Sequence, residues 1–349
     1  MNGASVIRLD AIPYLWKQLG TSCVHLPQTH ELIKLFHDVF EAVAPHVLLL
    51  TETNVPHKEN MTYVGNRGDE AQIIYNFTLP PLILWSLHKE DATILARWAG
   101  TLRSMGARAT YLNITATHDG IGMRPSEGIL SDEQRNELIQ LAFDHGGDIT
   151  GKRNADGSMS VYELNLNWFD AVNDPGADEP PDIQIRRFML TQSIVMTLIG
   201  IPAIYIHSLV GSRNDLAGVK RTGKARSINR EQLRLHRLRQ DLADPSTHRH
   251  KVFAETMRLL DIRASQTAFH PNAGQVVLGL GSEVFALRRH NETTGHSVIA
   301  LHNVTGRTVD VDLERAGLAE RSRDLLTGET ARCTISLAPY QAMWLTPCG

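Results

Sequence analysis

Acidic side chains follow three apolar, strand-like runs of the sequence. Arg8 and Asp10 stand two residues apart in the run 7–12, Glu52 follows the run 47–51, and His118 and Asp119 follow the run 109–115. Residues i and i+2 of a strand point to the same face, so Arg8 is expected beside Asp10, where its charge keeps the carboxylate ionised. An ionised carboxylate in such a place can act as a nucleophile.

The segments that carry these residues alternate between predicted strands and predicted helices. We expect strands at 7–12, 47–51, 73–77, 111–115 and 202–206, and helices at 29–44, 82–98, 131–143 and 184–198. Such alternation is typical of a parallel sheet. In a barrel of parallel strands the chemistry lies at the carboxyl ends of the strands. Asp10, Glu52 and Asp119 are therefore expected to meet at one end of the sheet.

Two carboxylates serving as nucleophile and acid/base, with a third that holds the sugar, form the arrangement of a retaining glycosidase. In this order the motifs resemble the α-amylase superfamily, glycoside hydrolase family 13, and more closely its sucrose phosphorylase branch, which includes glucosylglycerate phosphorylases. The resemblance covers nearly the whole chain. It rests on R-x-D-A at 8–11, E-T-N at 52–54, Y-N-F-T-L-P-P at 75–81, T-H-D-G-I-G at 117–122, G-S-R-N-D at 211–215 and R-S-I-N-R at 226–230.

The resemblance implies a role for each acidic residue. Asp10 would be the nucleophile that forms a β-glucosyl ester, and Arg8 would keep it ionised. Glu52 would be the acid/base, which requires a raised pKa for proton donation at neutral pH. Asp119 would bind sugar hydroxyls and favour the oxocarbenium-like transition state, with His118 donating a hydrogen bond beside it.

Two further segments are implied to line the site. The resemblance places Tyr162 and Glu163 on a mobile loop at the acceptor and phosphate site, and it matches Arg226 to an arginine that contacts the glucosyl unit. The sucrose enzymes typically carry Gln where Glu163 stands, which argues against plain sucrose as the substrate. Nearby cations could hold phosphate or an anionic acceptor: Lys220, Arg221, Lys224, Arg226 and Arg230.

The fold class that we expect is α/β: the C-terminal part of a (β/α)8 TIM barrel, about strands 4 to 8, followed by a small antiparallel all-β domain. We place the partial barrel at 1–282, with loop insertions at about 124–174 and 211–230. Short β runs with period-2 alternation, such as 308–313, place the β domain at 283–349.

About five barrel strands are recognisable, whereas a closed barrel has eight. The resemblance puts R-x-D on the fourth strand, so the chain is expected to be a fragment without the first half of the barrel. An open half barrel exposes strand edges and apolar surface. We therefore expect a homodimer or a requirement for the missing N-terminal half.

Composition narrows the class of protein. The net charge of −3 and a pI near 6.6 give no reason to expect a nucleic-acid or membrane partner. Three scattered cysteines are too few for a disulfide framework or a zinc cluster, and the 16 histidines lack metal-site spacing, so we expect no metal. Without a recognisable secretion signal, the cytoplasm is the expected location.

The predicted activity is that of a retaining α-glucoside phosphorylase, with inorganic phosphate as co-substrate and no organic cofactor. Double displacement would release α-glucose 1-phosphate. The acceptor is expected to be anionic, as in glucosylglycerate or sucrose 6-phosphate, or else to be the fructose of sucrose. Two alternatives stay open: an α-glucosidase or transglucosidase of the same family, and a catalytically inactive fragment or binding subunit.

Overall fold

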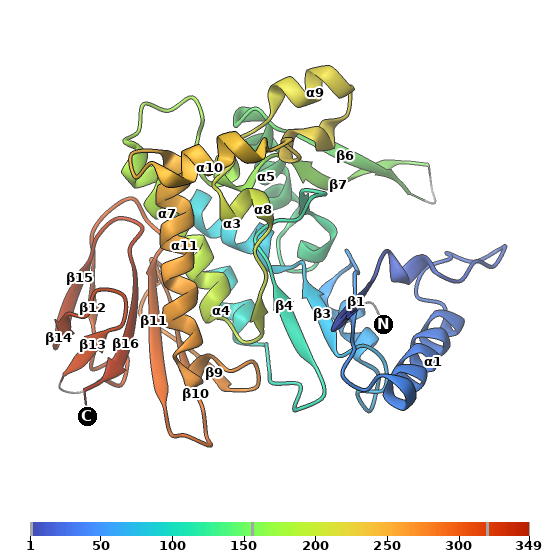
Figure 1. The fold of residues 1–349 in the computed structure, drawn as a ribbon, viewed down its shortest axis with the longest axis horizontal. Helices are drawn as coiled ribbons and strands as arrows, with labels where there is room; N and C mark the ends of the chain where they lie inside the picture. The colour runs from blue at the N-terminus through green and yellow to red at the C-terminus, as the bar shows by residue number, and fades with distance from the viewer. Residues whose placement is uncertain (1–2, 155–156, 319–320, 349) are drawn as a thin grey trace.

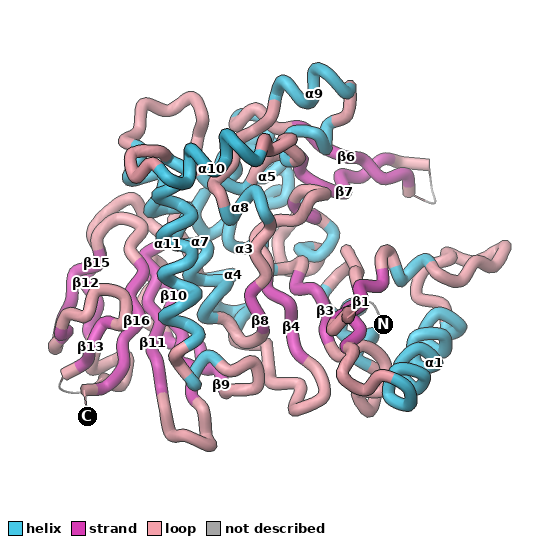
Figure 2. The backbone as a smooth tube through the Cα atoms, in the orientation of Figure 1, coloured by secondary structure: helices cyan, strands magenta, loops and turns pink. Residues whose placement is uncertain are grey.

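The structure is a computed structural model that describes residues 3–154, 157–318 and 321–348. Figure 1 shows an open parallel sheet with one helix at its outer end, a group of helices beside the sheet, and an antiparallel β unit on the opposite side of those helices. Figure 2 shows the same arrangement by element type. None of the helices in the described part of the chain has the length and apolar character needed to cross a bilayer.

Five short strands form the parallel sheet. They are β1 (Val6–Leu9), β2 (Leu48–Thr51), β3 (Ile73–Asn76), β4 (Thr110–Asn113) and β8 (Ile201–Pro202), arranged in that order. Each neighbouring pair is parallel. Within the described residues the sheet ends at β1 on one side and at β8 on the other. The expected partial barrel is confirmed.

Two strands are shorter than expected. β1 ends at Leu9 because Ala11 takes a left-handed conformation, with φ of 47°, and residues 12–14 form a 3-10 turn, η1 (Ile12–Tyr14). β8 comprises only residues 201 and 202, whereas a strand was expected at 202–206. Ala203 still donates a hydrogen bond to the Asn113 carbonyl, and the chain then enters α8 (Ile206–Leu209).

Helices cover one face of the sheet. The main ones are α1 (Pro27–Val43), α3 (Leu79–Lys89), α4 (Thr93–Ala99), α7 (Pro181–Thr197) and α11 (His248–Ala264). The helix expected at 82–98 is two helices, because Glu90 adopts a left-handed conformation after α3. Its carboxylate accepts hydrogen bonds from the Gly306 N–H and the Arg307 guanidinium, so this break ties the barrel to the β domain.

The insertions lie beyond the carboxyl ends of the strands. The first contains η3 (Arg124–Ser126), α5 (Asp132–Asp144) and α6 (Trp168–Val172), with a small antiparallel sheet of β5 (Ile121–Gly122), β7 (Met159–Asn165) and β6 (Asp148–Arg153). The second contains α9 (Leu216–Thr222) and η4 (Ala225–Asn229), and α10 (Leu235–Ala243) follows. Short elements at 57–64 are α2 (His57–Asn60) and η2 (Met61–Val64).

The C-terminal unit is antiparallel. One sheet has the order β14-β13-β16-β11-β10-β9 and a second pairs β12 with β15. The strands are β9 (Gly274–Leu278), β10 (Val284–His290), β11 (Ser297–Asn303), β12 (Val309–Asp312), β13 (Ser322–Asp324), β14 (Thr330–Ala331), β15 (Thr334–Leu337) and β16 (Ala342–Pro347). β12 alternates buried and exposed residues, as expected for a strand with one solvent face. β9, which follows η5 (Thr267–Phe269), lies before the predicted boundary at 283 and pairs with β10.

One hydrophobic cluster joins the barrel to the β domain, and a second lies within the β domain. The first cluster is the shared core. Its buried members come from α3, α4, α7 and α11 and also from β10, β11 and β16. Three polar side chains in this core pair with one another: the Trp344 indole N–H donates to Ser193 Oγ at 2.8 Å, and Ser193 Oγ lies 2.9 Å from His302 Nε2. The fully buried Arg289 guanidinium donates to the carbonyls of Thr197, His270, Ala273 and Gly274.

We predict that Arg289→Met lowers the free energy of unfolding by about 3 kcal/mol, because it leaves several buried carbonyls without a donor. Denaturant unfolding followed by circular dichroism measures the change. The matched control is Arg332→Met, which alters an exposed arginine of the same domain and should change stability by no more than about 0.5 kcal/mol. Equal effects of the two variants would contradict a structural role for Arg289.

Candidate active site

The turn after β1 holds the first part of the site. An Arg8 guanidinium nitrogen lies 2.5 Å from Asp10 Oδ1, so the predicted ion pair is present. The Asp10 side chain is 74% exposed. In the same turn the Ala11 N–H donates to Glu52 Oε2 at 2.8 Å. The left-handed conformation of Ala11 thus turns its N–H towards the neighbouring strand end.

Glu52 follows β2 and is held against β1 by the backbone, since its N–H donates to the Leu9 carbonyl at 3.1 Å. Burial raises the pKa of Glu52, and the Ala11 N–H and the Arg8 charge only partly offset this effect. The charges of Asp10 and Asp119 raise the pKa further, which indicates that the three predicted carboxylates share one electrostatic environment. A carboxyl group with a raised pKa is suited to proton donation near neutral pH.

Tyr75, at the end of β3, also faces the pair. The Arg8 guanidinium carbon lies 5.9 Å from the centre of the Tyr75 ring, within cation–π range. Burial raises the pKa of Tyr75, so its hydroxyl stays protonated at neutral pH. From the sequence, Tyr75 was noted only as part of the motif at 75–81. Strand alternation, which puts Tyr75 on the same face of the sheet as Arg8, could have predicted this contact.

Asp119 is the most highly connected carboxylate of the site. Its Oδ1 lies 2.8 Å from an Arg230 nitrogen and 3.1 Å from an Arg226 nitrogen, and its Oδ2 lies 3.4 Å from His118 Nε2. The turn needs glycine next, because Gly120 has φ of 113° and a Cβ there would lie 2.3 Å from the Leu164 carbonyl oxygen.

Glu163 on β7 lies opposite Asp119. Its Oε2 accepts two hydrogen bonds from Arg226, at 2.6 and 3.1 Å, so Arg226 bridges the two carboxylates. The Glu163 side chain is only 5% exposed. Burial raises the pKa of Glu163 to about 7 despite the attraction of Arg226. Burial likewise raises the pKa of its neighbour Tyr162.

The contacts that anchor the basic loop, residues 213–230, were not predicted. The Asn229 amide donates to the Thr117 carbonyl at 3.0 Å, and the Tyr205 hydroxyl donates to the Asn229 carbonyl at 2.9 Å. Arg230 Nε donates to the His118 carbonyl at 2.6 Å. These bonds span more than 100 residues of sequence for Asn229 and Arg230, and local sequence spacing carries no signal for them.

The G-S-R-N-D motif at 211–215 has a structural role nearby. An Arg213 nitrogen lies 3.1 Å from Asp170 Oδ1, and the Asn214 N–H donates to Asp170 Oδ2 at 2.6 Å. Through these contacts Asp170, at the start of α6, fixes the base of the basic loop.

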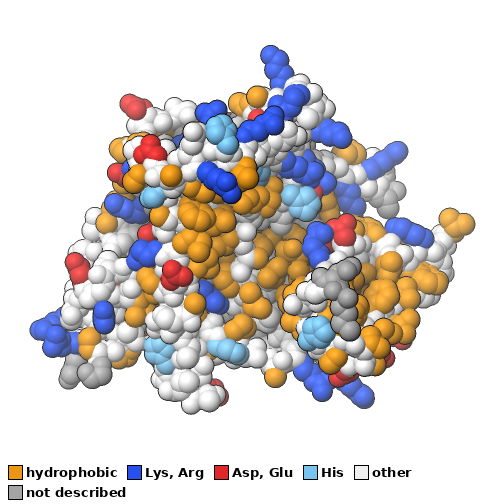
Figure 3. Space-filling model, viewed as in Figure 1, with side chains coloured by type: hydrophobic (Ala, Val, Ile, Leu, Met, Phe, Trp, Pro, Cys, Tyr) orange, Lys and Arg blue, Asp and Glu red, His pale blue; other side chains and the backbone are white. Residues whose placement is uncertain are grey.

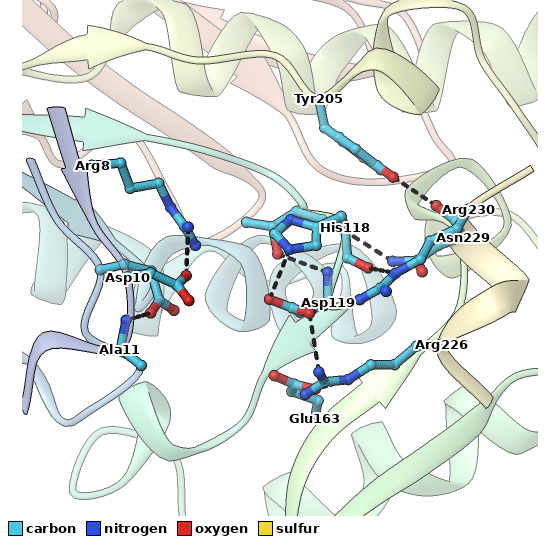
Figure 4. Close-up of polar contacts among 12 residues, drawn as sticks. Arg8, Asp10, Ala11, His118, Asp119, Glu163, Tyr205, Arg226, Asn229 and Arg230 are labelled. Atoms are coloured by element: carbon cyan, nitrogen blue, oxygen red, sulfur yellow. Dashed lines mark hydrogen bonds and ion pairs between the residues drawn. The ribbon is translucent and has the colours of Figure 1, made fainter. Parts of the chain in front are cut away.

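All eight predicted site residues lie at the carboxyl ends of the parallel strands or on the insertions above them. Figure 4 shows Arg8 and Asp10 on one side, and Asp119 with Glu163, Arg226 and Arg230 on the other. Their individual roles stay predictions. The described residues contain no group of three or more His, Cys, Asp or Glu side chains placed to hold a metal ion.

Comparisons with known proteins show the family to which the chain belongs. No family model matches the chain. The glucosylglycerate phosphorylase of Allomeiothermus silvanus is 43% identical over 345 residues, which is 99% of this chain and 60% of the relative. The sucrose phosphorylase of Bifidobacterium adolescentis is 26% identical over 268 residues, 74% of this chain and 49% of the relative. The crystal structure of sucrose 6F-phosphate phosphorylase from Thermoanaerobacter thermosaccharolyticum matches with a TM-score of 0.71 at 21% identity, covering 95% of this chain and 61% of that one.

The chain therefore has the fold of that phosphorylase structure. By its identity to the Allomeiothermus silvanus relative it belongs to the glucosylglycerate phosphorylase family, in the sucrose phosphorylase branch of glycoside hydrolase family 13. It spans 60% of the length of the Allomeiothermus silvanus relative.

We predict a pH-dependent stability that Glu163→Gln removes. The pKa of Glu163 is about 7 in the folded protein against 4.5 ordinarily, so between these values the folded state holds a proton that the unfolded state has lost. Stability contributed by the protonated group is therefore lost as pH rises through this window, by at most about 3 kcal/mol. The measurement is denaturant unfolding of both proteins from pH 4 to pH 8. A constant difference between them across this range would contradict the raised pKa.

Proposed function

We propose that this chain carries the nucleophile, the acid/base and the acceptor-side residues of a retaining α-glucoside phosphorylase. The observation that carries the proposal is the pair of strand-end carboxylates: Asp10 is ion-paired to Arg8, while burial raises the pKa of Glu52 on the next strand. One carboxylate lies against a guanidinium in the exposed turn and the other is buried with a raised pKa, an arrangement that suits a nucleophile and a proton donor for double displacement.

The reaction proceeds in two balanced steps. In the first, an Asp10 oxygen bonds to the anomeric carbon while the glycosidic bond breaks, and the proton of Glu52 goes to the departing oxygen. In the second, a phosphate oxygen bonds to the anomeric carbon, the ester to Asp10 breaks, and Glu52 recovers a proton from the attacking phosphate. The product is α-glucose 1-phosphate, and the anomeric configuration is retained. Neither step calls for a metal or an organic cofactor.

An anionic acceptor is the best fit to the basic loop. Beside Arg226 and Arg230 lies a cavity of about 410 Å³ that Thr150, Lys224 and Ser227 also line. Guanidinium and ammonium groups in such a cavity suit a carboxylate or a phosphate. The name of the Allomeiothermus silvanus relative specifies glucosylglycerate, an anionic glucoside, which supports the same class of acceptor.

One observation favours a second candidate function. The 74% exposure of the Asp10 side chain leaves its neighbourhood open to water, which would favour hydrolysis or transglucosylation over phosphorolysis, or leave the chain without turnover. Incubation with α-glucose 1-phosphate and an acceptor separates these outcomes. Acceptor-dependent phosphate release supports the phosphorylase, free glucose supports the hydrolase, and no product supports the inactive fragment.

A cytoplasmic location is also proposed, in keeping with the three free cysteines.

We predict that Asp10→Asn lowers the rate of acceptor-dependent phosphate release about 1,000-fold or more, since the amide cannot form the ester intermediate. The assay supplies α-glucose 1-phosphate with glycerate, fructose 6-phosphate or fructose in turn. Asp178→Asn changes an exposed loop carboxylate and serves as the control, with unchanged activity. Full activity of Asp10→Asn would exclude it as the nucleophile.

We predict that Lys224→Gln raises KM for an anionic acceptor roughly two- to fivefold and leaves KM for fructose unchanged, because it removes one exposed charge from the cavity. Initial rates at low and moderate salt measure the effect, which should shrink as salt rises. Lys251→Gln on α11 removes an exposed charge outside the cavity and should change neither constant. The same change for both acceptors would contradict a cationic acceptor site.

A further inference from the structure

A cavity of about 390 Å³ lies apart from the candidate active site. It forms where the start of α2, the helix α4 and residues 127–129 of the first insertion meet, and we call it the α2–α4 cavity. The eight predicted site residues are not among the described residues that line it. Cavities of this size often hold small molecules. Its lining includes Pro56, His57, Lys58, Ile94, Arg97 and Trp98.

Two side chains of this lining have buried nitrogen atoms without partners. Trp98 is 4% exposed, and its indole N–H finds no hydrogen-bond acceptor among the described residues. Nδ1 of His57 is buried and unpartnered in the same way. Nine buried side-chain polar atoms of the described residues lack a partner, and the lining of this cavity supplies two of them. An unpaired buried polar group is costly, so a partner from outside the chain would stabilise this arrangement.

The His57 ring is held by ring contacts alone in the described part of the chain. Its centre lies 6.1 Å from that of the Trp98 ring, edge to face, and 6.4 Å from that of the Tyr111 ring. Burial lowers the pKa of His57, so the ring is neutral at neutral pH. A neutral imidazole has one donor and one acceptor nitrogen, and an indole N–H only donates. Because no polar contact opposes it, a turn of the His57 ring can uncover both nitrogens for a ligand hydroxyl, which accepts from one and pairs with the other.

The charged side chains of the lining give the cavity a positive balance. Lys58 and Arg97 are exposed, and neither has an ion-pair partner among the described residues. Glu127 is the one carboxylate of the described lining, so two cations face one anion. Figure 3 shows a larger group of Lys and Arg side chains over α9 and α10, but those residues do not line this cavity. A single surplus positive charge suits a monoanion, and a carboxylate pairs well with a guanidinium group.

We propose that the α2–α4 cavity binds a small hydroxy-aromatic carboxylate. The carboxylate pairs with Lys58 and Arg97, and the aromatic ring lies against the apolar part of the lining, which includes Ile94 and Ile129. The ring hydroxyl accepts the hydrogen bond of the Trp98 indole. An uncharged ligand would leave the free cations unpaired, and a ligand without a hydroxyl would leave the two buried nitrogens unpaired.

A ligand in this cavity would contact the segment that follows the predicted acid/base. α2 begins at His57, five residues after Glu52. Asn60, the last residue of α2, donates from Nδ2 to the Tyr75 carbonyl at 2.7 Å, and its Oδ1 accepts a hydrogen bond from the Thr53 hydroxyl. A ligand packed against the start of α2 should therefore stiffen a short helix whose other end is fixed beside the ends of β2 and β3.

The test titrates the 349-residue chain, isotope-labelled at its tryptophans, with 4-hydroxybenzoate and follows the five indole N–H signals by NMR. The Trp98 signal, identified by its loss in Trp98→Phe, should shift and saturate as the indole gains an acceptor. Benzoate lacks the hydroxyl and 4-hydroxybenzyl alcohol lacks the charge, so each should bind about threefold to tenfold more weakly. Equal affinity for the three probes, or a Trp98 signal that no probe shifts, would overturn the proposal.

Charge variants test the position of the carboxylate. The double variant Lys58→Gln/Arg97→Gln should weaken binding of 4-hydroxybenzoate about threefold to tenfold and leave that of 4-hydroxybenzyl alcohol unchanged, because it removes two exposed charges and no apolar wall. Lys220→Gln removes an exposed cation of α9 and should bind like wild type. Wild-type affinity of the double variant for the carboxylate, or equal weakening for both probes, would contradict the site.

Hydrogen–deuterium exchange provides a second readout, which needs neither the variants nor the assignment of the tryptophan signals. With 4-hydroxybenzoate at saturation, exchange of backbone amides over 57–60 should slow, while that over 235–243 should not. Unchanged exchange over 57–60 would overturn the proposal. Binding does not depend on the proposed function, since neither Asp10 nor Glu52 lines the cavity. A protein that binds the probe but releases no phosphate would contradict that function and support the site.

Discussion

The backbone pairing of β1 with β2 is the constraint on which the candidate site depends. Parallel register brings the ends of the two strands level, and the bond from the Glu52 N–H to the Leu9 carbonyl continues the pairing past the last strand residue. The Ala11 N–H then reaches across to the Glu52 carboxylate. Two carboxylates that are 42 residues apart in sequence are thus fixed by main-chain geometry, which side-chain substitution alters little.

Burial then gives these carboxylates different properties. Asp10 extends into solvent beside a guanidinium, whereas Glu52 lies deeper, where loss of hydration outweighs the same positive charge. On the insertion side Arg226 lies between Asp119 and Glu163, and burial raises the pKa of Glu163 to about 7. Burial therefore raises the proton affinity of both Glu52 and Glu163, although a guanidinium lies near each of them.

Sequence reasoning predicted the features that depend on local pattern. Apolar runs gave the strands, and the polar residue after each run gave Asp10, Glu52 and Asp119. It did not predict the end of β1 at Leu9, because a left-handed Ala11 has no local signal.

Contacts between distant segments were also beyond local pattern. Arg226 bridges Asp119 and Glu163 because two insertions fold over the same strand ends. The Tyr205 hydroxyl, which donates to the Asn229 carbonyl, holds the basic loop in place. The helical periodicity at 29–44 predicted α1 correctly. Periodicity alone does not show which apolar residues of the helix are buried, such as Ile33, and which are exposed, such as Leu35 and Val39.

The shared core has a consequence for the order in which the protein opens. The cluster that joins α7 and α11 to the C-terminal sheet is broad, whereas the β1–α1 unit is tied to it by only a few buried side chains, such as Ile12 and Ile33. Local unfolding proceeds from the least buried unit, so β1 and α1 should detach while the remainder stays native. Arg8 and Asp10 belong to that unit. Any activity that depends on Asp10, the proposed nucleophile, would then be lost at temperatures below global melting, although spectroscopy would still detect a folded chain.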